Sequence, residues 1–251
     1  MLRQATPAPP EKQFFAFFEF YPRRISFFEF GKELFFWTVR HASGIIADMK
    51  RKIILIGGTP TVGKSTMAGL LSKQLDLPWI STDQTREIMR VIANKDDHPD
   101  LYNVEGHDAV SFLTTFSAEE IADMEFRQGI AAWAGNKKLI EDDYTWRQGF
   151  IVEGVNILPE LIPTLETSSD IRPIFLIDDS EERMREVVFG RGLWEDAHKY
   201  PDDVKEKEVE WATIFSKKLE KSALEHGYPV VKIEKNSEKD LQAVMTALGL
   251  Q

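Results

Sequence analysis

The sequence predicts an α/β fold in which helices flank a parallel β-sheet, because two patterns alternate from Lys50 onward. Short, continuously apolar runs are typical of parallel strands that are buried on both faces. Longer segments between these runs carry apolar residues three or four positions apart, the spacing of an amphipathic helix. Strands that alternate with helices favour a single sheet with right-handed crossover connections.

The first strand is predicted at residues 52–56, an apolar run that ends at two glycines, and the first helix at 64–75. Asp179 and Glu182 have the spacing of a capping box, which predicts that another helix begins near Ser180. Further strands are predicted at 78–81, 150–152, 174–177 and 230–233, and further helices at 84–94, 108–134, 204–226 and 238–248.

Composition excludes several kinds of chemistry. The 251-residue chain has no cysteine, which rules out disulfides, thiolate metal sites and cysteine nucleophiles, and which fits a cytoplasmic protein. Its net charge of −10 disfavours non-specific binding to nucleic acid, for which a basic face is needed. No apolar run is long enough to span a bilayer, so we expect no membrane partner.

Residues 1–48 differ from the rest of the chain. The stretch from Phe14 to Trp37, FFAFFEFYPRRISFFEFGKELFFW, is rich in phenylalanine but interrupted by charged residues. One interpretation is a disordered or non-native extension, with translation beginning at Met49, directly before the first predicted strand. The other is an interaction arm or a membrane-surface segment. We divide the chain into this extension and a domain at 49–251.

A phosphate-binding loop (P-loop) is predicted directly after the first strand, where residues 58–65 read G-T-P-T-V-G-K-S. Glycines let the backbone N–H groups curl around an anion, and the following helix presents its N-terminus to that anion. Lys64 would neutralise the β- and γ-phosphates and Ser65 would bind Mg²⁺. The predicted ATP-binding residues are Gly58, Thr59, Pro60, Thr61, Val62, Gly63, Lys64, Ser65 and Thr66.

Three segments together resemble 2-phosphoglycerate kinases and, more broadly, the P-loop kinases that include zeta toxins and chloramphenicol phosphotransferase. They are ILIGGTPTVGKST at 54–66, ISTDQTREIMR at 80–90 and IVEGVNILP at 151–159. The resemblance implies a nucleoside-kinase-like P-loop NTPase fold, with a five-stranded parallel sheet in the order 2-3-1-4-5 and a lid after the fourth strand. It departs at Pro99–Leu101, which is not followed by the family's serine-serine-tyrosine cluster, and this leaves the acceptor open.

Asp83, Arg86 and Arg90 follow the second strand and are predicted to handle the acceptor. The carboxyl ends of parallel strands face the ligand crevice, where Asp83 would accept or orient the attacking hydroxyl proton. Its alternative role is to cap the helix expected to begin at Gln84. The two arginines lie four residues apart, on one helix face, which suits an anionic acceptor. Alternatively they are solvated or pair with nearby acids such as Glu87.

Glu153 ends the third strand and is predicted to hold Mg²⁺ through a bound water, or the acceptor hydroxyl; Asp178 is the alternative. Asn156 would contact the acceptor or cap its loop. Lid arginines would stabilise charge on the transferring phosphoryl group, and Arg191, Arg185 and Arg183 follow the fourth strand. Arg191 is the preferred candidate and Arg185 the next.

Asn236, after the fifth strand, is assigned to the adenine. The chain is therefore predicted to be an ATP-dependent kinase that transfers the γ-phosphoryl group to a hydroxyl or other oxygen of a small, anionic metabolite. Lys64, Asp83 and Arg191 would carry catalysis. The alternatives are an ATP-binding or ATP-hydrolysing switch that acts on a protein partner, and a polynucleotide-end kinase.

The division at Met49 can be tested by truncation. A chain that begins at Met49 is expected to fold and to bind Mg·ATP as the full chain does, because the first predicted strand begins only at Lys52. The melting temperature and a calorimetric titration of both proteins measure this. A large loss of either in the shorter chain would show that the phenylalanine-rich segment contributes to the folded domain.

Overall fold

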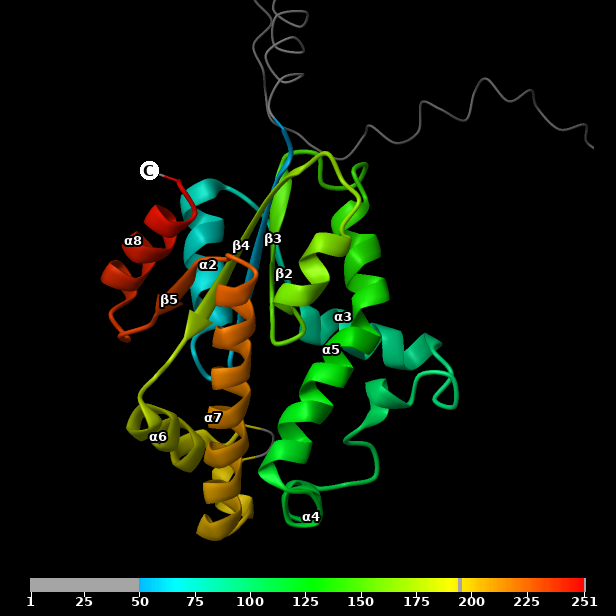
Figure 1. The fold of residues 1–251 in the computed structure, drawn as a ribbon, viewed down its shortest axis with the longest axis vertical. Coiled ribbons are helices and arrows are strands. Elements are labelled where there is room, and N and C mark those ends of the chain that lie inside the picture. The colour runs from blue at the N-terminus through cyan, green and yellow to red at the C-terminus, as the bar shows by residue number, and fades with distance from the viewer. Residues whose placement is uncertain (1–49, 194–195, 251) are drawn as a thin grey trace, which may run out of the picture. The chain divides into compact units, whose positions relative to one another are not determined.

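Five parallel strands form the centre of the computed structural model, which describes residues 50–193 and 196–250 (Figure 1). Their order is β2-β3-β1-β4-β5, the order that the family resemblance implies. The predictions for residues 1–48 fall outside the described residues. The strands are β1 Lys52–Gly58, β2 Trp79–Ser81, β3 Gly149–Glu153, β4 Asp170–Ile177 and β5 Val230–Lys232.

Helices cover both faces of the sheet, and alternate residues of β1 pack against the helices of opposite faces. Ile54 and Ile56 belong to one buried cluster, with residues of α2 (Lys64–Leu75) and α8 (Ser237–Ala247). Ile53 and Leu55 point to the opposite face and belong to a second, larger cluster. That face is covered by α4 Ala109–Thr115, α5 Ala118–Glu141, α6 Glu181–Arg191 and α7 Asp202–Glu225.

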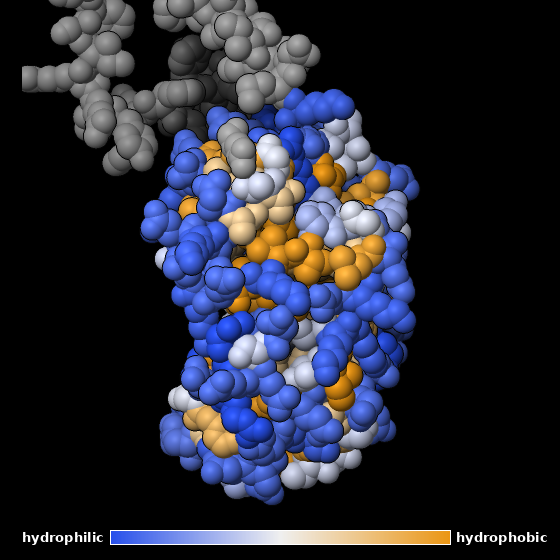
Figure 2. All heavy atoms as spheres, turned by 60° about the vertical axis from the view of Figure 1, so that its left-hand side comes forward, coloured by the Kyte–Doolittle hydropathy of each residue, from blue (hydrophilic) through white to orange (hydrophobic). Residues whose placement is uncertain are grey.

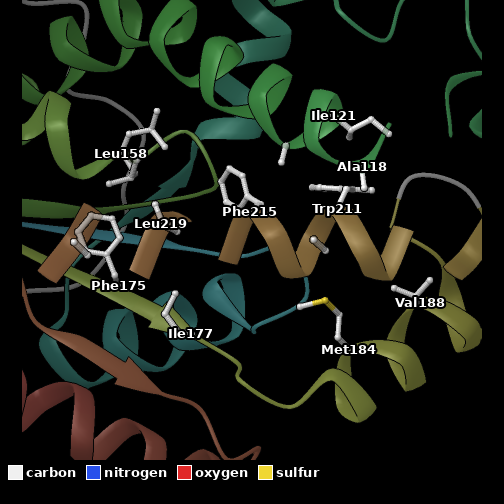
Figure 3. Close-up of a cluster of buried hydrophobic side chains, with 14 of the residues drawn as sticks. Ala118, Ile121, Leu158, Phe175, Ile177, Met184, Val188, Trp211, Phe215 and Leu219 are labelled. Atoms are coloured by element: carbon white, nitrogen blue, oxygen red, sulfur yellow. The ribbon is translucent and has the colours of Figure 1, made fainter. Parts of the chain in front are cut away.

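Helix α7 packs against α5 through the apolar stripe that the sequence places at Trp211, Phe215, Leu219 and Ala223. Figure 3 shows Phe215 and Leu219 pointing from α7 into the cluster that also contains Phe175 of β4. The rings of Phe215 and Phe126 of α5 lie 4.8 Å apart, so the two long helices share one aromatic contact near their middles.

Two local predictions are wrong. The segment 108–134 is two helices rather than one, because Ser117 accepts a hydrogen bond from the Glu120 backbone while the Glu120 carboxylate accepts one from the Ser117 backbone. This capping box begins α5, and α4 ends just before it, at Thr115. The helix after β4 is capped by Ser180, which accepts from the Arg183 N–H, and not by Asp179, which binds Lys232.

The remaining elements are α3 (Thr82–Ile92) and short 3₁₀ helices at Pro99–Tyr102, Pro159–Thr164 and Ala197–Lys199. No helix in the described part of the chain is long and apolar enough to cross a membrane. One face of the molecule is largely hydrophilic, with hydrophobic residues gathered near its middle (Figure 2).

The α5–α7 interface can be tested at Phe215, whose side chain is fully buried. We expect Phe215→Ala to lower the free energy of unfolding by about 3–5 kcal/mol, because it removes buried apolar surface and leaves a cavity. Urea denaturation measures the change. Leu224→Ala, at a position of the same helix that is 60% exposed, is the control and is expected to cost less than about 0.5 kcal/mol. Equal losses in the two variants would contradict this account of the core.

Candidate active site

The carboxyl ends of β1, β3 and β2 lie side by side and bring three sequence motifs together. In the sheet, Glu153 of β3 pairs with Ile56 of β1 on one side and with Ser81 of β2 on the other. The P-loop follows β1, and α3 follows β2 directly. Segments almost 100 residues apart in the chain therefore meet at one edge of the sheet.

The P-loop backbone adopts conformations that its glycines permit. Gly58 has φ 154°, and a Cβ atom there would lie 2.5 Å from the carbonyl oxygen of Leu176 on β4. Gly63, with φ 95°, precedes the first residue of α2 and accepts a hydrogen bond from the Met67 N–H. Thr61, at φ 72°, is a non-glycine residue in the left-handed region. Such curled loops present N–H groups to anions.

Lys64 is buried at the start of α2, and its ammonium donates a 2.6 Å hydrogen bond to the Thr59 carbonyl oxygen. Burial lowers the pKa of Lys64 to about 8, while the nearby carboxylates of Glu153 and Asp83 act in the opposite direction. Phosphate groups in the loop would supply further negative charge and favour the protonated lysine.

Ser65 donates a hydrogen bond of 3.0 Å from its hydroxyl to Glu153 Oε1. Glu153 is 2% exposed, so this carboxylate is held at the end of β3 with little contact with water. A hydroxyl and a carboxylate at this separation fit the way Mg²⁺ is held in phosphate sites, by one or two protein oxygens together with substrate phosphates and water. Within the described residues, no cluster of three or more His, Asp or Glu forms a separate metal site.

A cavity of about 560 Å³ opens from the P-loop and gathers most of the predicted catalytic and acceptor residues. Its volume lies within the usual range for small-molecule sites. The predicted residues that line it are Pro60, Thr61, Lys64, Ser65, Asp83, Arg86, Arg90, Glu153 and Arg191. Arg191, the preferred lid arginine, thus lies at the same cavity as Lys64, although it comes from the last turn of α6.

A second, smaller cavity of about 230 Å³ adjoins the outer side of the P-loop. Thr61, Val62, Gly63 and Thr66 line it on one side, and residues that follow β5 line it on the other. Asn236 does not line this cavity, although its neighbours Lys235 and Ser237 do. Its side chain instead caps α8, by accepting a hydrogen bond from the Lys239 N–H.

The start of α3 places Asp83 and Arg86 together at the main cavity. Asp83 Oδ1 lies 3.2 Å from Arg86 Nη1, and that guanidinium also donates a 2.9 Å hydrogen bond to Gln128 Oε1. Ser81, not Asp83, caps the helix, by accepting from the Asp83 N–H. The interpretation of Asp83 as a helix cap is therefore wrong, and its carboxylate stays available to the cavity.

Arg90 is held at the cavity by two interactions that fix its guanidinium. It donates to the Leu101 carbonyl oxygen and lies 2.7 Å from Glu87, which also pairs with Arg86. The expected pairing with Glu87 is therefore present. Both arginines nevertheless line the cavity. Their contacts with neighbouring residues therefore do not remove them from the space in which an acceptor would bind.

Arg185, Asn156 and Arg183 do not line the main cavity. Arg185 pairs with Glu206 and lies over the ring of Phe189, on the outside of α6. Asn156 is fully buried, does not line the cavity, and has no hydrogen-bond partner for its side chain among the described residues. Arg183 binds Asp178 at 2.6 Å, and Asp178, the alternative metal ligand, does not line the cavity either.

Sequence reasoning missed Glu125 and Gln128 of α5, which also line the cavity. A signal for them exists. Both fall on the buried stripe of α5, between Ile121 and Ala132, where an apolar residue is the ordinary choice. A carboxyl and an amide at these positions of an amphipathic helix indicate a polar site within the core.

No protein-family model matches the chain. The 2-phosphoglycerate kinase of Methanococcus vannielii is 36% identical over 117 residues, which are 44% of this chain and 37% of that protein. The mevalonate-3-phosphate 5-kinase of Thermoplasma acidophilum is 24% identical over 134 residues, 53% of this chain and 65% of that protein. A solved shikimate kinase from Aquifex aeolicus covers 78% of this chain and 96% of its own, with 19% identity and a TM-score of 0.43.

This chain therefore resembles the 2-phosphoglycerate kinases, as its three motifs indicate, but the matched segment is only about a third of the Methanococcus vannielii protein. The likeness to these relatives is thus confirmed at the level of sequence similarity. The five-stranded sheet and the P-loop are properties of this chain's own structure.

Glu125 is half-buried at the cavity, and its carboxyl is the perturbed acid of the site. Burial raises the pKa of Glu125, and the negative charge of Asp83 raises it further, while Arg86 and Arg90 oppose the shift. The folded protein thus binds the Glu125 proton more tightly than the unfolded chain does. The stability that this proton contributes to the fold is fully present below the pKa that glutamate has in the unfolded chain. It is lost as the pH rises through the raised pKa of the folded protein.

Replacing this carboxyl should change how stability depends on pH. Relative to the wild type, Glu125→Gln is expected to gain stability as the pH rises from about 4 to about 8, because glutamine never carries the buried charge. Urea denaturation at several pH values measures the difference. Glu119→Gln, at an exposed position of the same helix, is the control and should show no such trend. A pH-independent difference for Glu125→Gln would contradict the raised pKa.

Proposed function

We propose that the chain is an ATP-dependent kinase that transfers the γ-phosphoryl group to an oxygen atom of a small, anionic metabolite. The observation that carries this proposal is the single cavity that joins Lys64, Ser65 and Glu153 to Asp83 and Arg86. A nucleotide phosphate site and a site for an acceptor anion are continuous there. In phosphoryl transfer the protein contributes mainly positioning and charge stabilisation, and these residue types supply both.

Each residue has a role that its position supports. The P-loop backbone and Lys64 would bind the β- and γ-phosphates, and the smaller cavity beside α2 and α8 is the proposed base site. Ser65 and Glu153 would hold Mg²⁺, which supplies charge neutralisation on the phosphates. Asp83 would accept or orient the proton of the acceptor hydroxyl, and Arg191 would stabilise charge on the transferring oxygens.

Arg86 and Arg90 would bind the anionic group of the acceptor. Gln128 holds the guanidinium of Arg86 and the Leu101 carbonyl oxygen holds that of Arg90, so little side-chain freedom remains to be lost on binding. The relatives support this choice of substrate class, because both are named for kinases of small phosphorylated compounds. An ATP-dependent switch and a polynucleotide-end kinase remain the competing functions.

Release of ADP that depends on an acceptor separates the proposal from a switch. A screen of phosphorylated and carboxylated metabolites with Mg·ATP should find acceptors that stimulate ADP release, with the phosphoryl group recovered on the acceptor. ATP hydrolysis that no small acceptor stimulates would favour the switch. Salt-sensitive binding of oligonucleotides, with phosphate transferred to their ends, would favour the polynucleotide kinase.

Asp83→Asn is expected to preserve Mg·ATP binding and to lower acceptor-dependent ADP release by about 10²–10⁴-fold, because it removes the carboxylate charge but keeps the shape. Calorimetry and a coupled ADP assay measure the two properties. Lys64→Ala should instead weaken Mg·ATP binding in calorimetry by about tenfold or more, because it removes a charged contact to the phosphates. Asp97→Asn, at an exposed position, is the control. Full activity of Asp83→Asn would remove Asp83 from the mechanism.

A further inference from the structure

One acid of the main cavity has no hydrogen-bond or ion-pair partner among the described residues. Five acids of the described chain line this cavity, and four of them are engaged: Asp83 with Arg86, Glu87 with Arg86 and Arg90, Glu153 with Ser65, and Glu208 with Tyr200. Within the described chain, Glu125 alone accepts no hydrogen bond and forms no ion pair. Its carboxyl group is therefore available to a ligand.

Glu125 lies at the proposed site for the anionic group of the acceptor. It precedes Gln128 by three residues on α5, and residues with this spacing share one face of a helix. Gln128 accepts a hydrogen bond of 2.9 Å from Arg86, so Glu125 is one helical turn from a contact of that guanidinium. Both residues line the cavity, as do Arg86 and Arg90.

The acceptor side of the cavity holds more negative than positive charge when every group is ionised. Helices α3 and α5 supply two arginines, Arg86 and Arg90, and three carboxylates, Asp83, Glu87 and Glu125. An anion binds there favourably only if negative charge is withdrawn. Glu87 is 58% exposed and can turn into water, whereas Glu125 is half-buried on the inner face of α5. Glu125 therefore loses its charge most readily by taking up a proton.

We propose that Glu125 binds the anionic group of the acceptor as a neutral carboxylic acid, so that the acceptor enters the site together with one proton. This inference rests on the proposed function and adds a specificity-determining residue to it. The carboxylic O–H would donate to an oxygen atom of the anion, beside the guanidinium groups of Arg86 and Arg90. A neutral acceptor would gain no affinity from this proton.

The surroundings of Glu125 already oppose its charged form. Burial raises the pKa of Glu125 and the negative charge of Asp83 raises it further, while Arg86, Arg90 and Lys64 act in the opposite direction. A bound anion acts in the same direction as Asp83, so the pKa of Glu125 rises again on binding. Proton uptake is therefore expected at pH values between the pKa of the free site and the pKa of the occupied site.

The other charged groups near Glu125 are matched or do not titrate in this range. The cations that line the cavity are Lys64, Arg86, Arg90 and Arg191, and the other acids are Asp83, Glu87, Glu153 and Glu208. On elements packed against α5, Asp100 pairs with Arg127, and Lys218 pairs with Asp123. No histidine lines the described part of the cavity, so no imidazole titrates there between about pH 5 and about pH 8. Nucleotide phosphates would keep Lys64 protonated.

The test is calorimetry of sulfate binding to the full-length protein, with saturating Mg²⁺ and a non-hydrolysable ATP analogue to occupy the P-loop. Sulfate keeps both negative charges throughout the experiment, from about pH 5 to about pH 8, above the ordinary pKa of glutamate. The number of protons taken up follows from how the observed enthalpy depends on the ionisation enthalpy of the buffer. We expect uptake that approaches one proton at its maximum, and an affinity that falls by up to about tenfold per pH unit there. Sulfate binding without proton uptake, or no detectable binding, overturns the inference.

Two variants assign the proton to Glu125. Glu125→Gln has an amide N–H donor in place of the carboxylic O–H, so it should bind sulfate without proton uptake and with an affinity that does not fall as the pH rises. Glu125→Ala lacks the donor and should bind sulfate about tenfold or more weakly than Glu125→Gln. Glu119→Gln, at an exposed position of α5, is the control and should keep the wild-type uptake. Unchanged uptake in Glu125→Gln, or equal affinities of the glutamine and alanine variants, overturns the inference.

The outcomes separate this inference from the proposed function. Sulfate binding without proton uptake, together with acceptor-dependent ADP release, removes the proton on Glu125 and keeps the kinase. Proton-linked sulfate binding without ADP release from any acceptor keeps the anion site with its neutral carboxyl group and removes the kinase. Binding is measured without turnover, so neither result depends on the other.

Discussion

The pairing of β1 with β3 is the constraint on which the site depends. It places Ile56 beside Glu153, so that Ser65, the second residue of the P-loop helix α2, reaches the Glu153 carboxylate at 3.0 Å. The β2–β3 pairing adds Ser81, and with it the start of α3. If the register of β1 and β3 slipped by one residue, Glu153 would point to the opposite face of the sheet and the site would lose its buried carboxylate.

The charged groups of the cavity are stable in a buried place because they compensate one another. Lys64, Arg86, Arg90 and Arg191 line it together with the carboxylates of Asp83, Glu87, Glu125, Glu153 and Glu208. Burial still shifts three of these groups, since it lowers the pKa of Lys64 and of Arg90 and raises that of Glu125.

The sequence was sufficient for the strands, their buried character and the P-loop, because each depends on local pattern. The strand order came from the family resemblance, since periodicity does not encode which strands are neighbours. Side-chain roles were harder to predict, because the contacts that decide them, whether long-range or local, are not visible in the sequence pattern. Arg185 and Asn236 were assigned from their distance after strands, yet Glu206 holds the first and α8 uses the second as a cap. Glu125 falls on the buried stripe of α5, but only the structure shows that this stripe meets Asp83 and Arg86 of α3 at the cavity.

The role of Glu87 follows from comparing its two kinds of contact. In the empty cavity Glu87 bridges Arg86 and Arg90, but its side chain is 58% exposed, so each ion pair contributes less than about 1 kcal/mol. Gln128 is 2% exposed, and its uncharged amide oxygen accepts a hydrogen bond from the Arg86 guanidinium. An incoming acceptor would therefore displace Glu87 at little cost while Gln128 keeps the guanidinium in place. In the proposed anion site, Glu87 would thus be the exchangeable counterion and Gln128 the residue that positions Arg86.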